Sequence, residues 1–345
     1  MPQFDHKILD HRMSVTLKSA AEHLKRIGYS NTFASNTVLV REALERGITV
    51  TKTERFNYIQ LEFFGKVHKW RAGRNSLTKA LARRVTRYRD VTSALLNSQG
   101  VRTAENILID SADVDRGWAW ARSFDATVLK SNIQRKESGT NVPIESETEF
   151  RELFAQRVGS GSGPILVERF YHGATHRCLL VNGRVVAAAH LRPASVLGNG
   201  SSTIAELVKE KNTKRKGFPA HRNLPTGKGT HSFLSSQGLT SDFVPADAER
   251  VTISPASSPR GGGDAIDVSG ALTVEQTELV ESAVRVIPGL AIAEVDAIFR
   301  AEGESRSPVI LGINANPQIS MYHQPWEGTP QDVASAVLDA MFPDS

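Results

Sequence analysis

The sequence is poor in cysteine and lacks long apolar runs. Its 345 residues include one cysteine, Cys178, which excludes a disulfide within the chain and a cysteine-based metal cluster. No run of eighteen or more apolar residues occurs, so we expect no membrane span and no membrane partner. The opening residues, 1–13, are charged and hold no apolar signal core. These absences predict a cytoplasmic protein.

Aromatic residues are also few, at 7% of the chain, although the formal net charge is +5 and the isoelectric point lies near 9.3. A basic balance is typical of proteins that bind nucleic acid. The basic run 209–216 contains no aromatic residue, however, whereas RNA-binding surfaces interleave the two kinds. We therefore expect no nucleic-acid partner. The surplus of positive charge also suits a nucleotide and an acidic substrate, which are both anions.

Apolar residues make up 40% of the chain, enough for two or three packed subdomains. Apolar residues at helical spacing alternate with short β-branched runs, which predicts an α/β (α+β) fold with a helix-rich opening up to Asn75. We expect helices over 17–27, 38–44, 91–96, 149–156, 273–287 and 333–341, and strands over 48–50, 128–130, 165–167, 292–299 and 309–313.

Two further segments of the sequence allow specific predictions, a hairpin and a long polar stretch. Asn182-Gly183 stands between the apolar runs 177–181 and 184–188, which is typical of a β-hairpin with a type I′ turn. The polar stretch 211–229 is rich in glycine, proline and basic residues. We expect it to be a disordered excursion or a mobile lid.

The first candidate for chemistry is Lys130, which ends the strand 128–130. The polar loop 131–142 follows, with Gly139 inside it. Such a loop can fold over phosphates, because its backbone N–H groups and the lysine supply positive potential. A surface hairpin with a solvated lysine would show the same pattern, and by itself the segment favours that simpler reading.

The second candidate is a pair of polar residues on the late strands. Asp296 lies within the otherwise apolar strand 292–299, and Asn314 ends the strand 309–313. An acid and an amide on adjacent strands can hold a magnesium ion that also binds nucleotide phosphates. Alternatively, Asn314 caps the turn that follows it and Asp296 lies on a solvated face. The two residues alone do not separate these readings.

A third candidate is Glu168, which closes the strand 165–167 in front of Tyr171. A linker between two subdomains is a natural place for an adenine base. A glutamate at a strand end on the surface would show the same pattern.

Together and in this order, the segments resemble the ATP-grasp modules of cyanophycin synthetases and of bifunctional glutathione-forming ligases. The resemblance implies an ATP-grasp fold preceded by an N-terminal α/β domain. It covers about two thirds of the chain and rests on 36–50, 167–170, 173, 176–189, 193–207, 262–268 and 314–317. The implied subdomains are an N-terminal pre-grasp domain at 1–88, a central part at 89–173 and a C-terminal part at 174–345.

The resemblance also implies roles for single residues. Lys130 and Arg89 are expected to contact ATP phosphates, and the loop with Ser138 and Gly139 to close over them. Asp296 and Asn314 are expected to bind Mg²⁺. The residues expected to hold the nucleotide around its base and along the neighbouring strand are Glu168, Arg169, Phe170, Tyr171, His176 and Arg177.

Departures from the family pattern concern the same site. Gly312 stands where the family has a metal-binding glutamate, so one of two magnesium positions is expected either to be lost or to be filled by water or Glu294. Ser254-Pro255 occupy the stretch where the family has an arginine, and the nearby Arg260 is expected to replace it as a catalytic group beside Lys130. The phosphate loop carries Glu137 and lacks the family's proline after the lysine.

The resemblance predicts an ADP-forming ligase that joins a carboxylate to an amine of amino acids or short peptides through an acyl phosphate. The alternative is a degenerate ATP-grasp protein that binds nucleotide without this turnover, which the departures favour. Relatives of this kind imply a homodimer or a homotetramer.

Overall fold

The computed structural model describes residues 15–30, 33–133, 142–161, 163–299 and 308–343. The helices in this part of the chain are α1 (Leu17–Arg26), α2 (Ala34–Glu45), α3 (Ala80–Arg87), α4 (Arg89–Ser98), α5 (Val114–Ala121), α6 (Glu147–Gly159), α7 (Ile204–Arg215), α8 (Lys228–Ser236), α9 (Val274–Arg285), α10 (Ser320–His323) and α11 (Val333–Met341). The expected helices over 17–27, 38–44, 91–96, 149–156, 273–287 and 333–341 are therefore confirmed to within a few residues.

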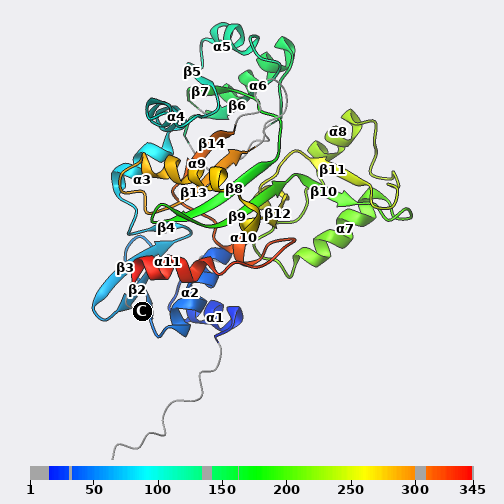
Figure 1. Cartoon of the computed structure of the whole chain (residues 1–345). Coiled ribbons are helices and arrows are strands. Elements are labelled where there is room, and N and C mark those ends of the chain that lie inside the picture. The colour runs from blue at the N-terminus through cyan, green and yellow to red at the C-terminus, as the bar shows by residue number, and fades with distance from the viewer. Residues whose placement is uncertain (1–14, 31–32, 134–141, 162, 300–307, 344–345) are drawn as a thin grey trace, which may run out of the picture.

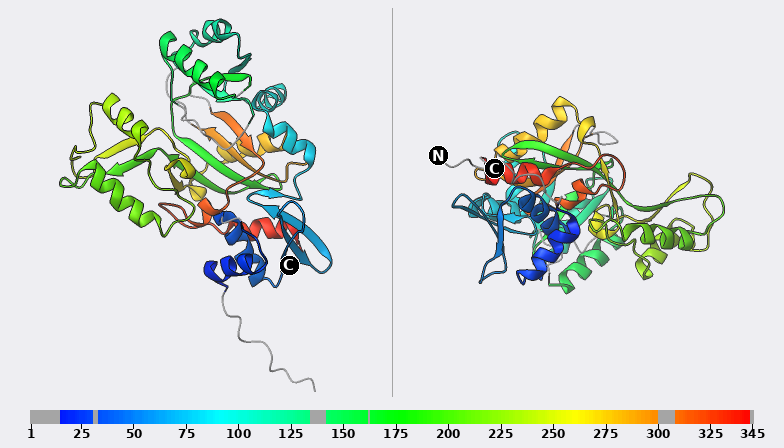
Figure 2. Two further views of the ribbon diagram at one scale, coloured as in Figure 1. Left: turned by 180° about the vertical axis from the view of Figure 1, so that it is seen from behind. Right: turned by 90° about the horizontal axis from the view of Figure 1, so that it is seen from below.

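The strands in the described residues form four sheets. Their bounds are β1 (Thr49–Lys52), β2 (Ile59–Phe63), β3 (Lys66–Arg71), β4 (Arg74–Asn75), β5 (Asn106–Ile109), β6 (Thr127–Ser131), β7 (Ile165–Arg169), β8 (Thr175–Val181), β9 (Arg184–Arg192), β10 (Ala194–Leu197), β11 (Arg250–Ser254), β12 (Asp264–Asp267), β13 (Ile292–Ile298) and β14 (Val309–Asn314). Figures 1 and 2 show α5 and α6 at one end of the molecule, α1, α2 and α11 at the other, and an arm of α7, α8, β10 and β11 to one side.

A five-stranded antiparallel sheet, in the order β12-β9-β8-β13-β14, forms the middle of the molecule. The alternation of side chains along β8 gives it two buried faces. Leu179 packs with α2 and α11 on one face, whereas Cys178 and Leu180 pack with α9 on the other. Asn182 and Gly183 join β8 to β9 with φ values of 48° and 75°, so the predicted type I′ hairpin is confirmed.

A second, three-stranded sheet in the order β5-β7-β6 lies above the first, covered by α5 and α6. The aromatic rings of Phe150 and Phe154 on α6 stack with their centroids 5.9 Å apart and fill its core. Helix α4 begins at the lower edge of this sheet, where the carbonyl oxygen of Asn132 accepts a hydrogen bond from the backbone N–H of Arg89 at 3.0 Å. The two sheets therefore meet along a seam that α4, β6 and β7 border.

The expectation for 211–229 is wrong, because the segment is neither disordered nor a free lid. It continues α7 and leads into α8, and Arg215, His221 and Leu224 are buried. Arg215 donates to Asp264 at 2.5 Å and lies over the ring of Trp326 at 5.4 Å. A buried ion pair and an aromatic contact therefore anchor a stretch whose composition is that of a loop.

The helix-rich opening expected up to Asn75 is only half right. Helices α1 and α2 are present, but a four-stranded meander, β1-β2-β3-β4, follows them. Its turns place Phe64 and Ala72, at φ 45° and 49°, where glycine or asparagine is usual. Gly65 and Gly73 follow them at φ 74° and 92°, so only the second residue of each turn carried the usual signal. No helix of the described residues is long and apolar enough to span a membrane.

Candidate functional site

A cleft of about 290 Å³ opens between the three-stranded sheet and the five-stranded sheet. This volume is close to the lower end of the roughly 300–1,000 Å³ usual for small-molecule sites. Lys130, Glu168, Arg169, Phe170 and Tyr171 all line it, from β6, β7 and the segment after β7. The structure therefore brings these five predicted residues together in one cleft.

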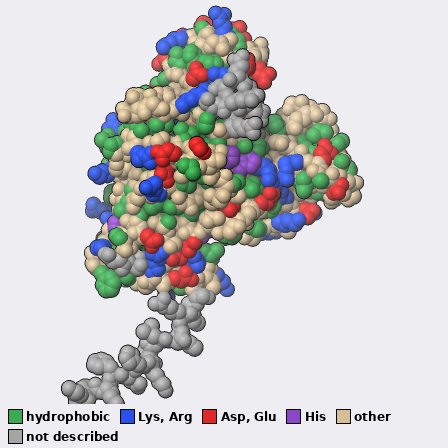
Figure 3. All heavy atoms as spheres, in the orientation of Figure 1, with side chains coloured by type: hydrophobic (Ala, Val, Ile, Leu, Met, Phe, Trp, Pro, Cys, Tyr) green, Lys and Arg blue, Asp and Glu red, His purple; other side chains and the backbone are tan. Residues whose placement is uncertain are grey.

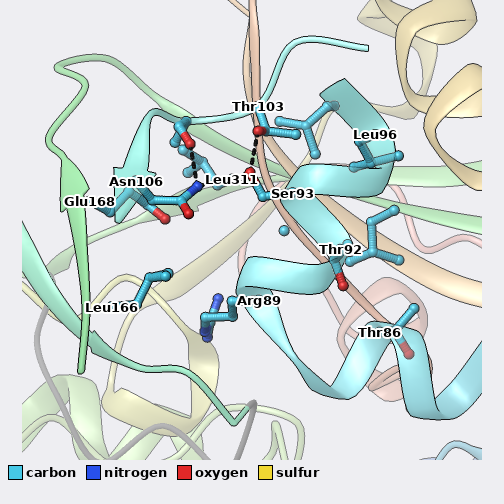
Figure 4. A pocket seen from close by; sticks show the side chains of 14 residues that line it. Thr86, Arg89, Thr92, Ser93, Leu96, Thr103, Asn106, Leu166, Glu168 and Leu311 are labelled. Atoms are coloured by element: carbon cyan, nitrogen blue, oxygen red, sulfur yellow. Dashed lines mark hydrogen bonds between the residues drawn. The ribbon is translucent and has the colours of Figure 1, made fainter. Parts of the chain in front are cut away.

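A smaller hollow adjoins the cleft and shares Glu168 and Leu311 with it. Figure 4 shows this hollow, with the side chain of Arg89 reaching from the start of α4 toward Leu166 on β7. Arg89 thus lies on the opposite side of Glu168 from the open cleft, close to the residues predicted with it.

Lys130 and Glu168 form a buried ion pair across the neighbouring strands β6 and β7. Only 10% of the lysine side chain and 5% of the glutamate side chain are exposed. Each charge compensates the other in a place where an isolated charge would be strongly destabilising. The surface hairpin with a solvated lysine is therefore excluded.

The segment after β7 is fixed by one acidic residue, Glu105. Arg169 Nη1 donates to Glu105 Oε1 at 2.8 Å, and the Tyr171 hydroxyl donates to the same oxygen at 3.3 Å. The Arg169 guanidinium also lies 5.2 Å from the centre of the Tyr171 ring. Burial raises the pKa of Tyr171. These contacts hold Arg169 and Tyr171 in place along the wall of the cleft, with Phe170 between them.

On β8, His176 and Arg177 have different surroundings. The His176 ring lies 5.5 Å from the His190 ring and 4.9 Å from the Phe299 ring, and burial lowers the pKa of both histidines. Histidine side chains gather near the middle of the face in Figure 3, beside Lys and Arg side chains. Arg177 instead donates to Asp296, with Nε to Oδ1 at 2.6 Å and Nη2 to Oδ2 at 2.8 Å.

Asp296 and Asn314 lie on adjacent strands, as expected, but they are not directly opposite each other. The register of β13 and β14 pairs Asp296 with Gly312, and Glu294 with Asn314. Asn314 Nδ2 donates to Glu294 Oε2 at 3.0 Å, and the Gln318 backbone N–H donates to Glu294 Oε1 at 2.9 Å. Burial raises the pKa of Glu294, which is 1% exposed. Glu294 therefore lies beside Asn314, one of the two predicted magnesium ligands.

Arg260 lies on a short 3₁₀ turn, Pro259–Gly261, near the same carboxylates. Its guanidinium lies 5.3 Å from the centre of the Phe33 ring, from the N-terminal part of the chain. Burial, opposed by the Glu294 charge, lowers the pKa of Arg260. No carboxylate of the described residues forms an ion pair with Arg260 at the distances seen for the other arginines. Ser138 and Gly139 lie outside the described residues.

The chain is similar to known proteins of two kinds. The chain is 29% identical over 318 residues to the cyanophycin synthetase of Trichormus variabilis, covering 90% of this chain and 35% of that protein. It is 26% identical over 326 residues to the glutathione biosynthesis bifunctional protein GshAB of Clostridium perfringens, covering 92% of this chain and 42% of that protein. The chain therefore spans less than half the length of these relatives. No model of a known protein family matches it.

The structure superposes on a bifunctional glutathione synthetase from Pasteurella multocida with a TM-score of 0.66 and 20% identity, over 95% of this chain and 46% of that chain. The fold is an ATP-grasp fold. The resemblance to cyanophycin synthetases and bifunctional glutathione-forming proteins, and the α/β class, are thereby confirmed.

The ATP-grasp cleft offers few metal ligands among the residues that the structure describes. In the described part of the chain, no three His, Cys, Asp or Glu side chains gather in a way that could hold a metal ion. Asp296 and the Asn314 amide are hard oxygen donors, and Mg²⁺ commonly takes one or two such groups together with substrate phosphates. The donor set therefore fits a magnesium ion that arrives with a nucleotide. Magnesium binding by Asp296 and Asn314 stays a prediction.

One feature near the ATP-grasp cleft was missed in the sequence. Residues 51–89 contain eleven Lys and Arg against two Asp and Glu, a longer stretch of one-sided charge than the run 209–216. The turn between β3 and β4 packs against the end of the Asn314 motif, where a Cβ on Gly73 would lie 2.4 Å from the Pro317 carbonyl oxygen. Counting charges in windows along the chain would have found it.

Proposed function

We propose that the chain is an ADP-forming ligase that couples a carboxylate to an amine, using ATP and Mg²⁺. The observation that carries this proposal is the cleft itself, with Lys130 and Glu168 at its floor. Support also comes from the relatives, since one is called a cyanophycin synthetase and another a glutathione biosynthesis protein. Amino acids or short peptides are the proposed substrates, and the proposed location is the cytoplasm. A homodimer or homotetramer is the proposed assembly.

The proposed nucleotide site uses both walls of the cleft. Phe170 and Tyr171 would pack along the base, and the backbone after β7 would bind its polar edge. Lys130 and Arg89, on either side of Glu168, would attract the phosphates. Asp296 and Asn314 would hold Mg²⁺, which when bound screens phosphate charge and orients the terminal phosphate. We also propose that the chain divides at residues 88 and 173.

The proposed reaction has two steps. A carboxylate oxygen of the first substrate attacks the terminal phosphorus of ATP, the bond to ADP breaks, and an acyl phosphate forms. The amine nitrogen of the second substrate then attacks the acyl carbon, phosphate leaves and the amine loses a proton. Arg260 is proposed to hold the first substrate's carboxylate, because a guanidinium offers two parallel donors to such a group. Its position near Glu294 and Phe33 supports this role.

Incubation of the purified chain with Mg-ATP and pools of amino acids and dipeptides tests the proposal. Phosphate, ADP and AMP are measured together. ADP and phosphate that depend on particular substrates support the ligase, whereas AMP and pyrophosphate would indicate adenylation instead. Asp296→Asn should abolish the product, while the matched change Asp242→Asn, at an exposed residue of the arm, should not. Nucleotide binding without turnover by any pool would favour the degenerate ATP-grasp protein.

A further inference from the structure

Gly312 lies on β14, the edge strand of the five-stranded sheet, and lines the smaller hollow beside the cleft. In the antiparallel register it lies directly opposite Asp296, which in turn lies opposite Arg177 on β8. Directly opposed residues project to the same face of a sheet. A row across three strands therefore reads arginine, aspartate, glycine, and its last position has no side chain.

The guanidinium of Arg89 lies over this bare position. A Cβ built on Gly312 would be 3.4 Å from Arg89 Nη1, which is the only heavy atom of the described residues within 4 Å apart from its chain neighbours. A methyl group would fit there in ordinary contact, but any longer side chain would meet the guanidinium. The Arg89 guanidinium, which comes from α4, therefore lies next to the place that a side chain at position 312 would occupy.

The backbone at Arg89 is fixed by hydrogen bonds to Asn132. Arg89 is the first residue of α4, and its backbone N–H donates to the Asn132 carbonyl at 3.0 Å. The Asn132 side chain accepts from the backbone N–H of Asp90 at 3.1 Å, so it caps the helix. The start of α4 is thus tied to β6, the strand of Lys130, and Arg89 extends into the hollow beside Glu168 (Figure 4).

A second arginine adds to the positive potential at this point. Burial lowers the pKa of Arg157 on α6, and repulsion by Arg89 lowers it further. Arg157 therefore adds to the positive charge around Arg89, and positive charge favours a bound anion. Phosphate oxygens are matched especially well by guanidinium groups.

The carboxylates on the described part of the cleft are mostly engaged elsewhere. Glu168 pairs with Lys130, and Glu294 is buried with bonds to Asn314 and Gln318. Asp296 remains, with Arg177 on one side of it. One carboxylate and one amide are enough for a single phosphate-bound Mg²⁺, and are few for two ions.

We propose that Arg89, lying over Gly312, supplies positive charge to the nucleotide's phosphates in place of a second metal ion, so that nucleotide binds with one divalent cation per chain. This inference rests on the proposed nucleotide site. Arg89 would act as a fixed cation, because an arginine side chain keeps its charge at any physiological pH. Nucleotide affinity would then depend on Arg89 as well as on metal concentration.

The test counts metal ions. The full chain is saturated with AMP-PNP and titrated with Mn²⁺, and bound Mn²⁺ is measured by electron paramagnetic resonance. We expect one tightly bound ion per chain. Two ions per chain with bound nucleotide would overturn the inference and leave the proposed function standing. Failure of AMP-PNP to bind at any Mn²⁺ concentration would overturn both.

Matched variants test the role of the arginine itself. Arg89→Gln should weaken AMP-PNP binding about tenfold or more, whereas Arg84→Gln, at an exposed arginine of α3, should leave it unchanged. The double variant Arg89→Gln with Gly312→Glu should bind a second Mn²⁺, because a carboxylate then occupies the space that the guanidinium left. Unchanged affinity in Arg89→Gln, or one ion in the double variant, would contradict the inference. Should Arg89→Gln fail to fold, the ion count of the unmodified chain still decides.

Discussion

Arg177 binds both carboxylate oxygens of Asp296, at 2.6 and 2.8 Å, from the directly opposite position on the neighbouring strand. Side-on pairing of this kind fixes the plane of the carboxylate, because two parallel hydrogen bonds leave it little freedom to rotate. Each oxygen retains lone pairs that point away from the guanidinium. Arg177 therefore orients Asp296 without preventing it from serving as a ligand.

This pairing predicts a positioning role for Arg177. Arg177→Lys keeps the charge but loses the fork, so Asp296 gains rotational freedom. We expect ATP-dependent turnover to fall about 100-fold, the scale of effect for a misplaced reacting group, with the fold retained. Initial rates of ADP release, with circular dichroism as the check on folding, measure this. A rate equal to that of the unmodified chain would contradict the positioning role.

Lys130 and Glu168 should be coupled in stability. Lys130→Met leaves the Glu168 carboxylate buried without its partner, and we expect a loss of about 3–5 kcal/mol in the free energy of unfolding. Lys130→Met with Glu168→Gln removes both charges and should be less destabilised than the single variant. Urea unfolding of Lys130→Met, Glu168→Gln and the double variant gives the coupling free energy between the two side chains. Additive losses would mean that the two side chains do not compensate each other.

The double variant also separates stability from binding. If Lys130 contacts phosphates, the double variant should regain stability and still bind AMP-PNP more weakly than the unmodified chain. Calorimetric titration with AMP-PNP measures this. Full affinity in the stable double variant would remove Lys130 from the nucleotide site.

His323 should make the stability fall in mild acid. Burial lowers its pKa from 6.5 to about 4, and its Nε2 accepts a hydrogen bond from the Ala334 backbone N–H at 3.0 Å. The unfolded chain therefore binds the proton more readily, so stability is complete above about pH 6.5 and is lost as the pH falls toward 4. The expected loss is about 3 kcal/mol.

His323→Gln provides the comparison, because its amide oxygen still accepts from the Ala334 N–H but does not titrate. We expect its urea midpoint to change less between pH 7.5 and pH 5 than that of the unmodified chain. His231→Gln, at an exposed histidine of α8, serves as the control. Equal pH dependence in all three proteins would show that His323 does not contribute.

Cys178 should be inert in the folded protein. It is fully buried in the five-stranded sheet, and burial, with the nearby Asp296 charge, raises its pKa to about 12. Because the thiolate is the reactive form, we expect no modification by iodoacetamide at pH 8 and complete modification in 6 M urea, a denaturing condition. Mass spectrometry detects the adduct. Rapid modification without denaturant would contradict this placement.

Local sequence was a reliable guide wherever short-range contacts decide the structure. The hairpin at Asn182-Gly183 follows from backbone preferences of two residues, and α9 begins where Thr273 and Gln276 cap each other. Helix α11 occupies the residues that its apolar spacing predicts. The sequence resemblance extended these local elements to an ATP-grasp fold.

Local sequence failed where distant contacts decide. The polar stretch 211–229 has the composition of a loop, yet Arg215 is buried because Asp264 lies opposite it in the folded chain. The N-terminal meander turns at Phe64 and Ala72, residues that give no turn signal, and its buried Trp70 is held by a bond to Asn36 at 3.1 Å. In both cases tertiary partners override what composition suggests.

The sequence by itself determined the fold class, the main helices and strands, and the residue types that point to nucleotide and metal chemistry. Only the tertiary structure decided which of these side chains meet: Lys130 with Glu168, Arg177 with Asp296, and Arg89 with the bare position at Gly312. The physical reason is that such pairs depend on strand order and register. These are set by packing between segments up to 223 positions apart, as for Arg89 and Gly312, and no local pattern encodes them.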